Sequence, residues 1–409
     1  MKRILFLLLI IGMGSVLPGF AAPAPQIENQ VAMAYVLANE VWLADEQGNS
    51  IYNTGLILDE RQAATLFWSP DGKNLYVATR DGLFMVSAAG SAAVRLPGVF
   101  GLTLAFARHG SIIYNIDVEN PQQVTETTIA FPIRETNVAN MAEGRGRLVN
   151  YIGEYDAASA QLSVTHAAAL YARDNGLLGS GRPHLWATYG GGLFYSCCFP
   201  NPGLGLIQMG TGEIIANYDP GFMPGAASLN DAASRLAGPT TDSRIRIIDL
   251  ITASGRDYVL EIPGGYEMIE RTTWAIDDSA IYFITREFPE LPLEVLNTIT
   301  YPADTRSAFA SLWQLDLVSG RTTLLAEFGD IFGVSSLAVT HDHVFAVVVE
   351  RNEALINALN RSEIPGDITP TDPLLNNYMP RTALYRYNLR DTTLTRLTEN
   401  VWGVTARPS

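Results

Sequence analysis

Charged residues are scarce in this chain of 409 residues. They make up 17% of the sequence, whereas roughly 25% is usual for soluble proteins. Acidic residues outnumber basic ones by 42 to 27, which gives a formal net charge of -15. A surface for nucleic acid needs a stripe of basic residues, so we expect no nucleic-acid partner.

Cysteine is rarer still, and the only two cysteines are the neighbours Cys197 and Cys198. Adjacent cysteines can close a strained disulfide ring, which an oxidising compartment permits. The alternative is a pair of free, buried thiols, because a strand points neighbouring side chains to opposite faces. Both readings stay open at this point.

Histidine is also sparse, with five residues in the chain. His341-Asp342-His343 could present two imidazoles to a metal, but it falls where a hairpin turn is expected. A tetrahedral site needs a third or fourth ligand, and His109, His166 and His184 are scattered. We therefore interpret the His-Asp-His stretch as a turn and expect neither a metal nor a cofactor.

Motifs of known catalytic chemistry are missing. There is no Gly-x-Ser-x-Gly elbow, and Gly190-Gly191-Gly192 is too short for a phosphate loop, so we interpret it as a hairpin. A hydrolase domain would need roughly 200 further residues beside the strand-rich region. We name no catalytic residue and expect a protein that is not an enzyme.

The only long apolar run lies at the N-terminus. Lys2 and Arg3 precede the uninterrupted apolar segment Ile4 to Ile11, and small residues follow up to Ala22. This pattern predicts a signal peptide over residues 1–22, a short linker over 23–30 and an exported protein. The alternative is a retained membrane anchor; no later segment is long enough to span a bilayer.

The clearest pattern runs from Leu66 to Leu96 and predicts four short strands joined by tight turns. Pro70-Asp71-Gly72 and Asp81-Gly82 supply the residues that turns require, and the segments between them alternate or are apolar. Strands this short and this tightly joined must be antiparallel neighbours. One such sheet would expose an apolar face, so it needs copies to stack on.

Weaker copies of this four-stranded unit recur along the chain. We expect them at 31–44 with a further strand from Ser50 (lacking the first strand), and at 102–117, 185–218, 227–260, 273–325 and 337–397. Residues 118–182 either complete the third unit with insertions or hide an extra one. The tail, Val401 to Ser409, looks like the first strand that the N-terminal unit lacks. Pairing of the two ends would close a ring of sheets and hide their edges.

The repeat resembles that of TolB-type, WD40-like β-propellers. The resemblance rests on Trp68-Ser69-Pro70-Asp71-Gly72, on Leu75-Tyr76-Val77 and on a third strand from Leu83. It implies an all-β propeller, most simply of seven four-stranded blades, with six or eight as alternatives. One domain would then cover residues 31–409. Five tryptophans recur at blade positions and are expected to pack between blades: Trp42, Trp68, Trp186, Trp274 and Trp313.

Insertions interrupt the repeat near 118–182, 287–309 and 351–381, and the last two are rich in proline. Long loops in a compact domain are usually functional or disordered. Three breaks, at 287–306, 351–381 and 199–203, fall at the same link within their units. We expect these three to form a recognition surface for a protein, peptide or glycan on one face of a monomeric binding or scaffold module. The alternatives are plain surface loops, or a propeller lyase or hydrolase with its site at the channel mouth.

Overall fold

The computed structural model describes residues 27–96 and 226–408. Within these ranges, it leaves out short gaps, the segment 288–307 and most of 352–380. Between these two parts it describes the strands that lie within 112–218. Among the described residues, the regular structure is β-strand, apart from a 3₁₀ position at Ala226 and helical positions at Ala354, Asn357 and Ala358. The predicted signal peptide over 1–22 lies outside the described residues.

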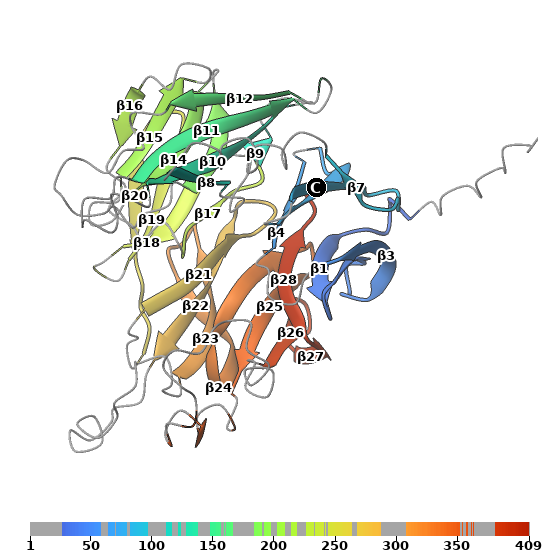
Figure 1. Cartoon of the computed structure of the whole chain (residues 1–409). Helices are drawn as coiled ribbons and strands as arrows, with labels where there is room; N and C mark the ends of the chain where they lie inside the picture. The colour runs from blue at the N-terminus through green and yellow to red at the C-terminus, as the bar shows by residue number, and fades with distance from the viewer. Residues whose placement is uncertain are drawn as a thin grey trace, which may run out of the picture.

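The described strands form six antiparallel sheets (Figure 1). The first sheet has the order β28 (Val401–Ala406), β1 (Met33–Leu37), β2 (Glu40–Ala44) and β3 (Ser50–Ile57). The second runs β4 (Thr65–Trp68), β5 (Asn74–Thr79), β6 (Gly82–Ser87) and β7 (Val94–Arg95). The third has the order β12 (Gln161–His166), β11 (Leu148–Asp156), β10 (Thr128–Asn137) and β8 (Ile112–Ile116), with β9 (Gln122–Gln123) beside β10.

The fourth sheet comprises β13 (His184–Tyr189), β14 (Gly192–Cys197), β15 (Gly203–Gln208) and β16 (Ile214–Tyr218). The fifth comprises β17 (Ser228–Leu229), β18 (Arg235–Pro239), β19 (Arg244–Asp249) and β20 (Gly255–Val259). The sixth has seven strands: β21 (Met268–Trp274), β22 (Ala280–Glu287), β23 (Ala308–Asp316), β24 (Thr322–Val339), β25 (His343–Glu350), β26 (Arg381–Asn388) and β27 (Leu394–Glu399).

The predicted pairing of the tail with the first unit is present. β28 pairs antiparallel with β1, with Ala406 opposite Met33 and Val404 opposite Tyr35. The first unit therefore takes its first strand from the other end of the chain. Because this strand completes the sheet, the two ends of the chain are held by one hydrogen-bonded ladder.

Residues 118–182 extend the third unit. The strands β10, β11 and β12 lie in the same sheet as β8, so within the described residues this region adds no further sheet. The predicted insertions between the strands, and the expected first strand at 102–108, lie outside the described residues.

The sixth and seventh units differ from expectation because they share one strand. Residues Thr322 to Ile331 of β24 pair with β23, and Ile331 to Val339 pair with β25. The last strand of one unit thus continues directly as the first strand of the next. Gly329, with a φ of 78°, lies where the pairing with β23 becomes irregular. This glycine allows the strand to bend at the irregularity and to continue beyond it.

The same pattern of hydrogen bonds recurs in four turns between the third and fourth strands of a unit. In each, a side-chain oxygen accepts hydrogen bonds from two backbone N–H groups that follow it within four residues; the residues are Asp45, Asp249, Asp316 and Asn388. Such side chains stabilise turns locally, in place of backbone partners. Their recurrence at one position supports the interpretation of units 1, 5, 6 and 7 as copies of one motif.

The first strands of successive units lie side by side. β17 contacts β21, β21 contacts β24, β24 contacts β28, and β28 contacts β4. Four-stranded sheets stacked about their first strands are the construction of a β-propeller. The described units 5, 6, 7, 1 and 2 therefore follow one another around a common centre.

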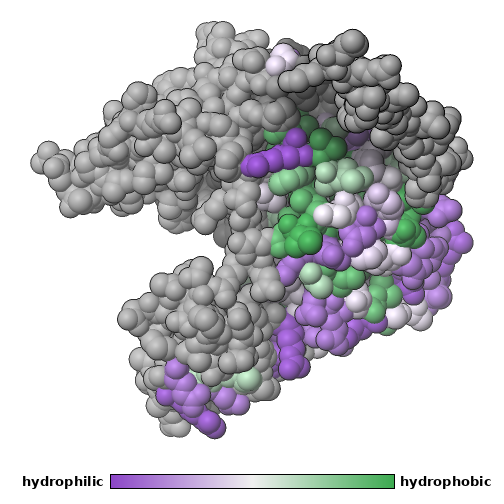
Figure 2. All heavy atoms as spheres, turned by 45° about the vertical axis from the view of Figure 1, so that its right-hand side comes forward, coloured by the Kyte–Doolittle hydropathy of each residue, from purple (hydrophilic) through white to green (hydrophobic). Residues whose placement is uncertain are grey.

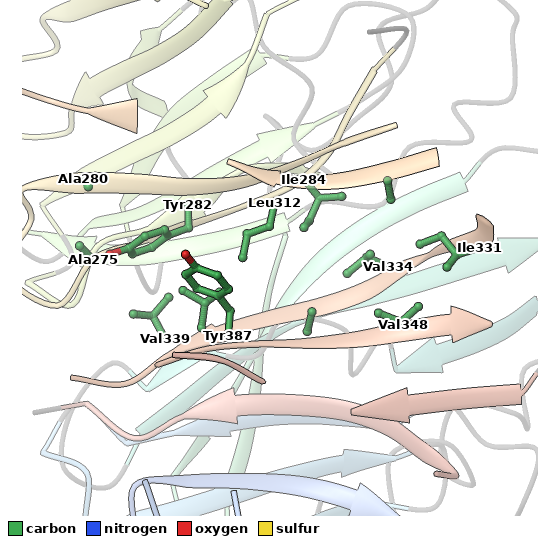
Figure 3. Close-up of a cluster of buried hydrophobic side chains, with 13 residues drawn as sticks. Ala275, Ala280, Tyr282, Ile284, Leu312, Ile331, Val334, Val339, Val348 and Tyr387 are labelled. Carbon is green, nitrogen blue, oxygen red and sulfur yellow. The ribbon is translucent and has the colours of Figure 1, made fainter. Parts of the chain in front are cut away.

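Apolar side chains fill the space between neighbouring sheets. The core between units 6 and 7 brings together Tyr282 of β22, Leu312 of β23, Val334 of β24 and Tyr387 of β26, and the two tyrosine side chains point toward each other (Figure 3). Burial, and then Asp277 and Tyr387, raise the pKa of Tyr282 to about 12, so it stays neutral.

The predicted role of the tryptophans is confirmed where the structure describes it. Trp68 lies in the core between units 1 and 2, and Trp274 and Trp313 lie in the core between units 5 and 6. The indoles of Trp274 and Trp313 donate to Ser228 O and Thr285 Oγ1. On the side that carries β1 and β3, hydrophobic residues gather toward the middle of the surface and hydrophilic ones along its edge (Figure 2).

Gly48 offers a test of the packing between units 7 and 1. Its φ of 84° disfavours a side chain, and an added Cβ would lie 2.8 Å from Leu397 Cδ1 and 2.9 Å from Phe345 Cε1. Gly55 has a similar φ of 72° and open space around it. We expect Gly55→Ala to lower the free energy of unfolding by about 1 kcal/mol and Gly48→Ala by about 1–3 kcal/mol more, because overpacking adds to backbone strain. Urea unfolding of both variants measures this, and equal losses would contradict the described contact.

Candidate functional site

The two proline-rich inserts leave the seven-stranded sheet on the same side, at a row of aligned strand ends that we call its insert edge. They separate β22 from β23 and β25 from β26. The strand ends form one row across the sheet, in which the opposed pairs are Glu287 and Phe309, Ala308 and Ile331, Ile331 and Glu350, and Glu350 and Arg381. The interiors of the inserts lie almost entirely outside the described residues. Their roots, however, are fixed on one edge of one sheet.

Charged and aromatic side chains gather at these roots, and we call this set the insert rim. Its described members are Glu270, Arg286, Glu350, Tyr385 and Arg396. Ion pairs and hydrogen bonds join them in two groups, one in unit 7 and one between units 6 and 7. Since charged residues are few in this chain, their concentration here marks the edge as distinct.

The first group centres on the Glu350 carboxylate at the end of β25. Arg396 binds it with two parallel hydrogen bonds, Nε to Oε1 at 2.6 Å and Nη2 to Oε2 at 2.9 Å, and the Tyr385 hydroxyl donates to Oε1 at 3.0 Å. Hydrogen bonds from Arg396 hold the pKa of Glu350 below its usual range, despite partial burial. Burial and then Glu350 raise the pKa of Tyr385. The carboxylate is therefore held ionised and in a fixed orientation, which suits a structural anchor.

The second group ties unit 6 to unit 7. Glu270 of β21 and Arg286 of β22 form an ion pair, with Nη2 and Oε1 3.3 Å apart and each side chain 15% exposed. The other oxygen of Glu270 accepts a hydrogen bond from Val334 N in β24, at 3.1 Å. Removing one member of such a largely buried ion pair is costly, because the other charge would be left without its partner.

Gly333 makes room for this ion pair. An added Cβ at Gly333 would lie 2.7 Å from Glu270 Oε1 and closer still to Arg286 Nη2. Any side chain at this position would displace the pair. The absence of a side chain on β24 is therefore what allows the two charges to reach across the strand.

Exposed apolar residues lie beside the charged ones. Phe309, opposite Glu287, is 50% exposed, and Met268, opposite Arg286, is 39% exposed. The register puts Phe309 on the same face of the sheet as Glu287, and Met268 on the other face with Arg286. Large exposed apolar side chains are typical of surfaces that bind partners, where a few of them carry most of the binding energy. The rim thus combines anchored charge with accessible apolar surface.

The predicted vicinal disulfide stays a prediction. The backbone of Cys197 ends β14 opposite Gly203, and Cys198 lies outside the described residues. Neither cysteine belongs to the insert rim as described.

The interpretation of His341-Asp342-His343 as a turn is confirmed. Thr340 N donates to His343 O at 2.9 Å and closes the hairpin between β24 and β25. His341 is exposed, whereas His343 is 5% exposed, so the two imidazoles do not form a pair. Among the described residues, no group of three or more His, Cys, Asp or Glu side chains could hold a metal ion. Nor does that part of the chain contain a helix long and apolar enough to cross a bilayer.

The rim residues were not singled out from the sequence. The available signal was a charged pair directly after an apolar strand, as in Arg286-Glu287 and Glu350-Arg351, each at the start of an insert. Their partners could not be found this way, since Glu270 and Val334 lie 64 residues apart along the chain. The helical spacing of Leu355, Ile356 and Leu359 predicts a helix over 353–360 in the second insert, and the described positions Ala354, Asn357 and Ala358 are helical.

Gly333→Ala tests the ion pair between units 6 and 7. We expect this variant to lose about 2 kcal/mol of unfolding free energy, because the added methyl group displaces Arg286 or Glu270. Gly403→Ala on β28 is the matched control, since an added Cβ there meets nothing within 4 Å. Urea unfolding compares the two, and an equally small loss in both would refute the described packing.

A double-mutant cycle on Glu350 and Arg396 tests the other group. We expect a coupling of about 1 kcal/mol at neutral pH from Glu350→Gln, Arg396→Gln and the double variant. The lowered pKa means that this stabilisation is present above the ordinary range of a Glu carboxyl and is lost as the pH falls through the folded-state pKa. Unfolding free energies measured from neutral to acid pH give the coupling. A coupling that does not weaken in acid would contradict the assignment.

No protein-family model matches the sequence, and no curated protein matches it. Among solved structures, the chain is similar to TolB from Acinetobacter baumannii, at 12% identity and a TM-score of 0.41, over 93% of this chain and 67% of that one. It is also similar to the β-propeller domain of Cps50 (Swd1) from Myceliophteria thermophila, at 11% identity and a TM-score of 0.44, over 83% and 88% of the two chains. A putative TolB from Agrobacterium tumefaciens matches at 8% identity and a TM-score of 0.37, over 74% and 90%. The chain is thus similar to TolB and WD40 β-propellers. Its fold is assigned from its own repeated four-stranded sheets.

Proposed function

We propose that this chain is an exported, monomeric β-propeller that binds a protein, peptide or glycan across the insert rim. The observation that carries the proposal is the common edge from which both proline-rich inserts leave. Their roots at Glu287, Phe309, Glu350 and Arg381 are aligned by the register of one continuous sheet. Two inserts anchored in one row can act together on a single partner.

The proposed propeller has seven blades in a single domain over 31–409. Five of the sheets supply one blade each, and the seven-stranded sheet supplies two that share β24. The ring would be closed by β28, which stands as the first strand of the first blade. Closure in this way leaves the outer, last strands as the exposed edges.

Export is proposed from the sequence over residues 1–22. A net acidic, charge-poor chain also suits a partner recognised by shape, by apolar contact and by a few fixed charges. Phe309 and Met268 would supply apolar contact, and the guanidinium and carboxylate groups of the rim would supply hydrogen bonds. No group of the rim is assigned a catalytic role.

Phe309→Ser tests the proposal against a matched control. Phe309 is 50% exposed at the root of the first insert, opposite Glu287, whereas Leu324, 44% exposed, lies on β24 opposite Trp313, away from both inserts. We expect the wild type and Leu324→Ser to capture the same protein or glycan from the native envelope fraction, and Phe309→Ser to capture at least tenfold less, which corresponds to about 1.4 kcal/mol. Quantitative mass spectrometry and glycan analysis of the captured material give the readout. Equal capture by all three proteins, or no specific capture by the wild type, would overturn the proposal.

A further inference from the structure

The contact between units 7 and 1 joins the two ends of the chain. Its apolar part packs Phe345 and Val347 of β25 against Tyr35 of β1 and Val404 of β28. At one end of this contact, the turn 45–49 of unit 1 meets the turn 340–343 of unit 7. We call the meeting of these two turns the latch.

Polar contacts hold the latch together. Asp342 N donates to Glu46 Oε1 at 3.2 Å, and Arg386 Nη1 donates to Gln47 O at 3.0 Å. Within unit 1, the Tyr35 hydroxyl donates to Gly48 O and fixes the turn from below. Two hydrogen bonds therefore cross from unit 7 to the turn of unit 1, one from the turn that precedes β25 and one from β26.

A buried histidine lies in the middle of this arrangement. His343 is 5% exposed, its ring centre lies 5.9 Å from that of Phe345, and its buried Nδ1 has no hydrogen-bond partner among the described residues. The buried Nε atom of Arg386 likewise has no partner in the part of the chain that the structure describes. A neutral imidazole tolerates such a site, whereas an imidazolium ion would be buried beside a guanidinium.

The charged groups around His343 come from every neighbouring element. Arg386 lies on β26, Glu46 on the turn of unit 1, Asp342 on the histidine's own turn and Asp391 on the turn between β26 and β27. Asp342 is already engaged by Arg390, at 2.8 Å from Nε and 2.7 Å from Nη2. Burial first, and Arg386 second, hold the pKa of His343 below the ordinary value of a histidine, against the opposing effect of the three carboxylates.

We propose that the latch is an acid-sensitive switch: protonation of His343 beside Arg386 loosens the contact between units 7 and 1, where the two ends of the chain are joined. The sign follows from linkage. A neutral buried imidazole stabilises the folded state fully above its unfolded pKa, and that stabilisation is lost as the pH falls below it. This inference rests on the latch alone and does not depend on the function proposed for the insert rim.

Hydrogen exchange of the full-length mature protein tests the switch. Amide exchange, corrected for the intrinsic effect of pH, is compared by mass spectrometry near pH 7.5 and near pH 5.5. We expect the segments 40–58, 340–350 and 381–399 to exchange several-fold faster in acid, while 280–287 and 308–316 in unit 6 change little. Unchanged protection of the latch segments in acid would overturn the proposal.

Three variants assign the effect to His343. His343→Gln, which cannot be protonated, is expected to lose the acid response, and His341→Gln, which alters the exposed neighbour, is expected to keep it. Should His343→Gln not fold, Arg386→Met answers the same question. Without the neighbouring cation, the ratio of acid to neutral exchange in the latch is expected to fall. An acid response identical in the wild type and the folded His343 variant, or undiminished in Arg386→Met, would refute the assignment.

Discussion

Apolar burial on both faces of the sheets whose side chains are described is the constraint on which the rest of this structure depends. In β5, four consecutive residues from Leu75 to Ala78 are buried, although neighbouring side chains point to opposite faces. β22 and β25 show the same pattern. A sheet buried on both faces cannot stand alone, so every unit needs two neighbours. The unit that contains the two ends of the chain must also be covered on both faces. The pairing of β28 with β1 completes the sheet of that unit.

Much of this arrangement could be predicted because its signals are local. A turn needs Asp, Asn or Gly at particular positions, and Asp71-Gly72, Ala38-Asn39 and Asp277-Asp278 all lie at turns in the structure, with φ positive at Gly72, Asn39 and Asp278. The missing first strand of the N-terminal unit could also be inferred by counting strands against the tail. What escaped prediction is not local. The sharing of β24 depends on hydrogen bonds to strands on both sides, which the spacing of apolar residues does not reveal, and the pairing of Glu270 with Arg286 is defined by Val334 in another unit.

The candidate site follows from the same division between buried strands and their ends. Strands covered on both faces leave little room for charge, so charged side chains collect where strands end and the chain leaves the sheet. Glu350 follows six buried residues of β25 and one half-buried valine, and Arg286 follows six buried residues of β22. Each is then matched by an opposite charge within reach, which keeps a half-buried ion compatible with folding. The rim is thus both the end of the packed layer and the beginning of the inserts.

The latch and the insert rim lie at opposite ends of one hairpin. β25 and β26 pair without irregularity from His343 opposite Asn388 to Glu350 opposite Arg381. Eight residues of strand span about 24 Å at roughly 3.4 Å per residue. The ladder therefore links His343 at one end to Glu350 and Arg381 at the other without a break. Arg396 and Tyr385 bind the Glu350 carboxylate, so the rim end of β25 is held to β26 and β27 of unit 7. A single pair of strands thus runs from the latch to the proposed binding surface.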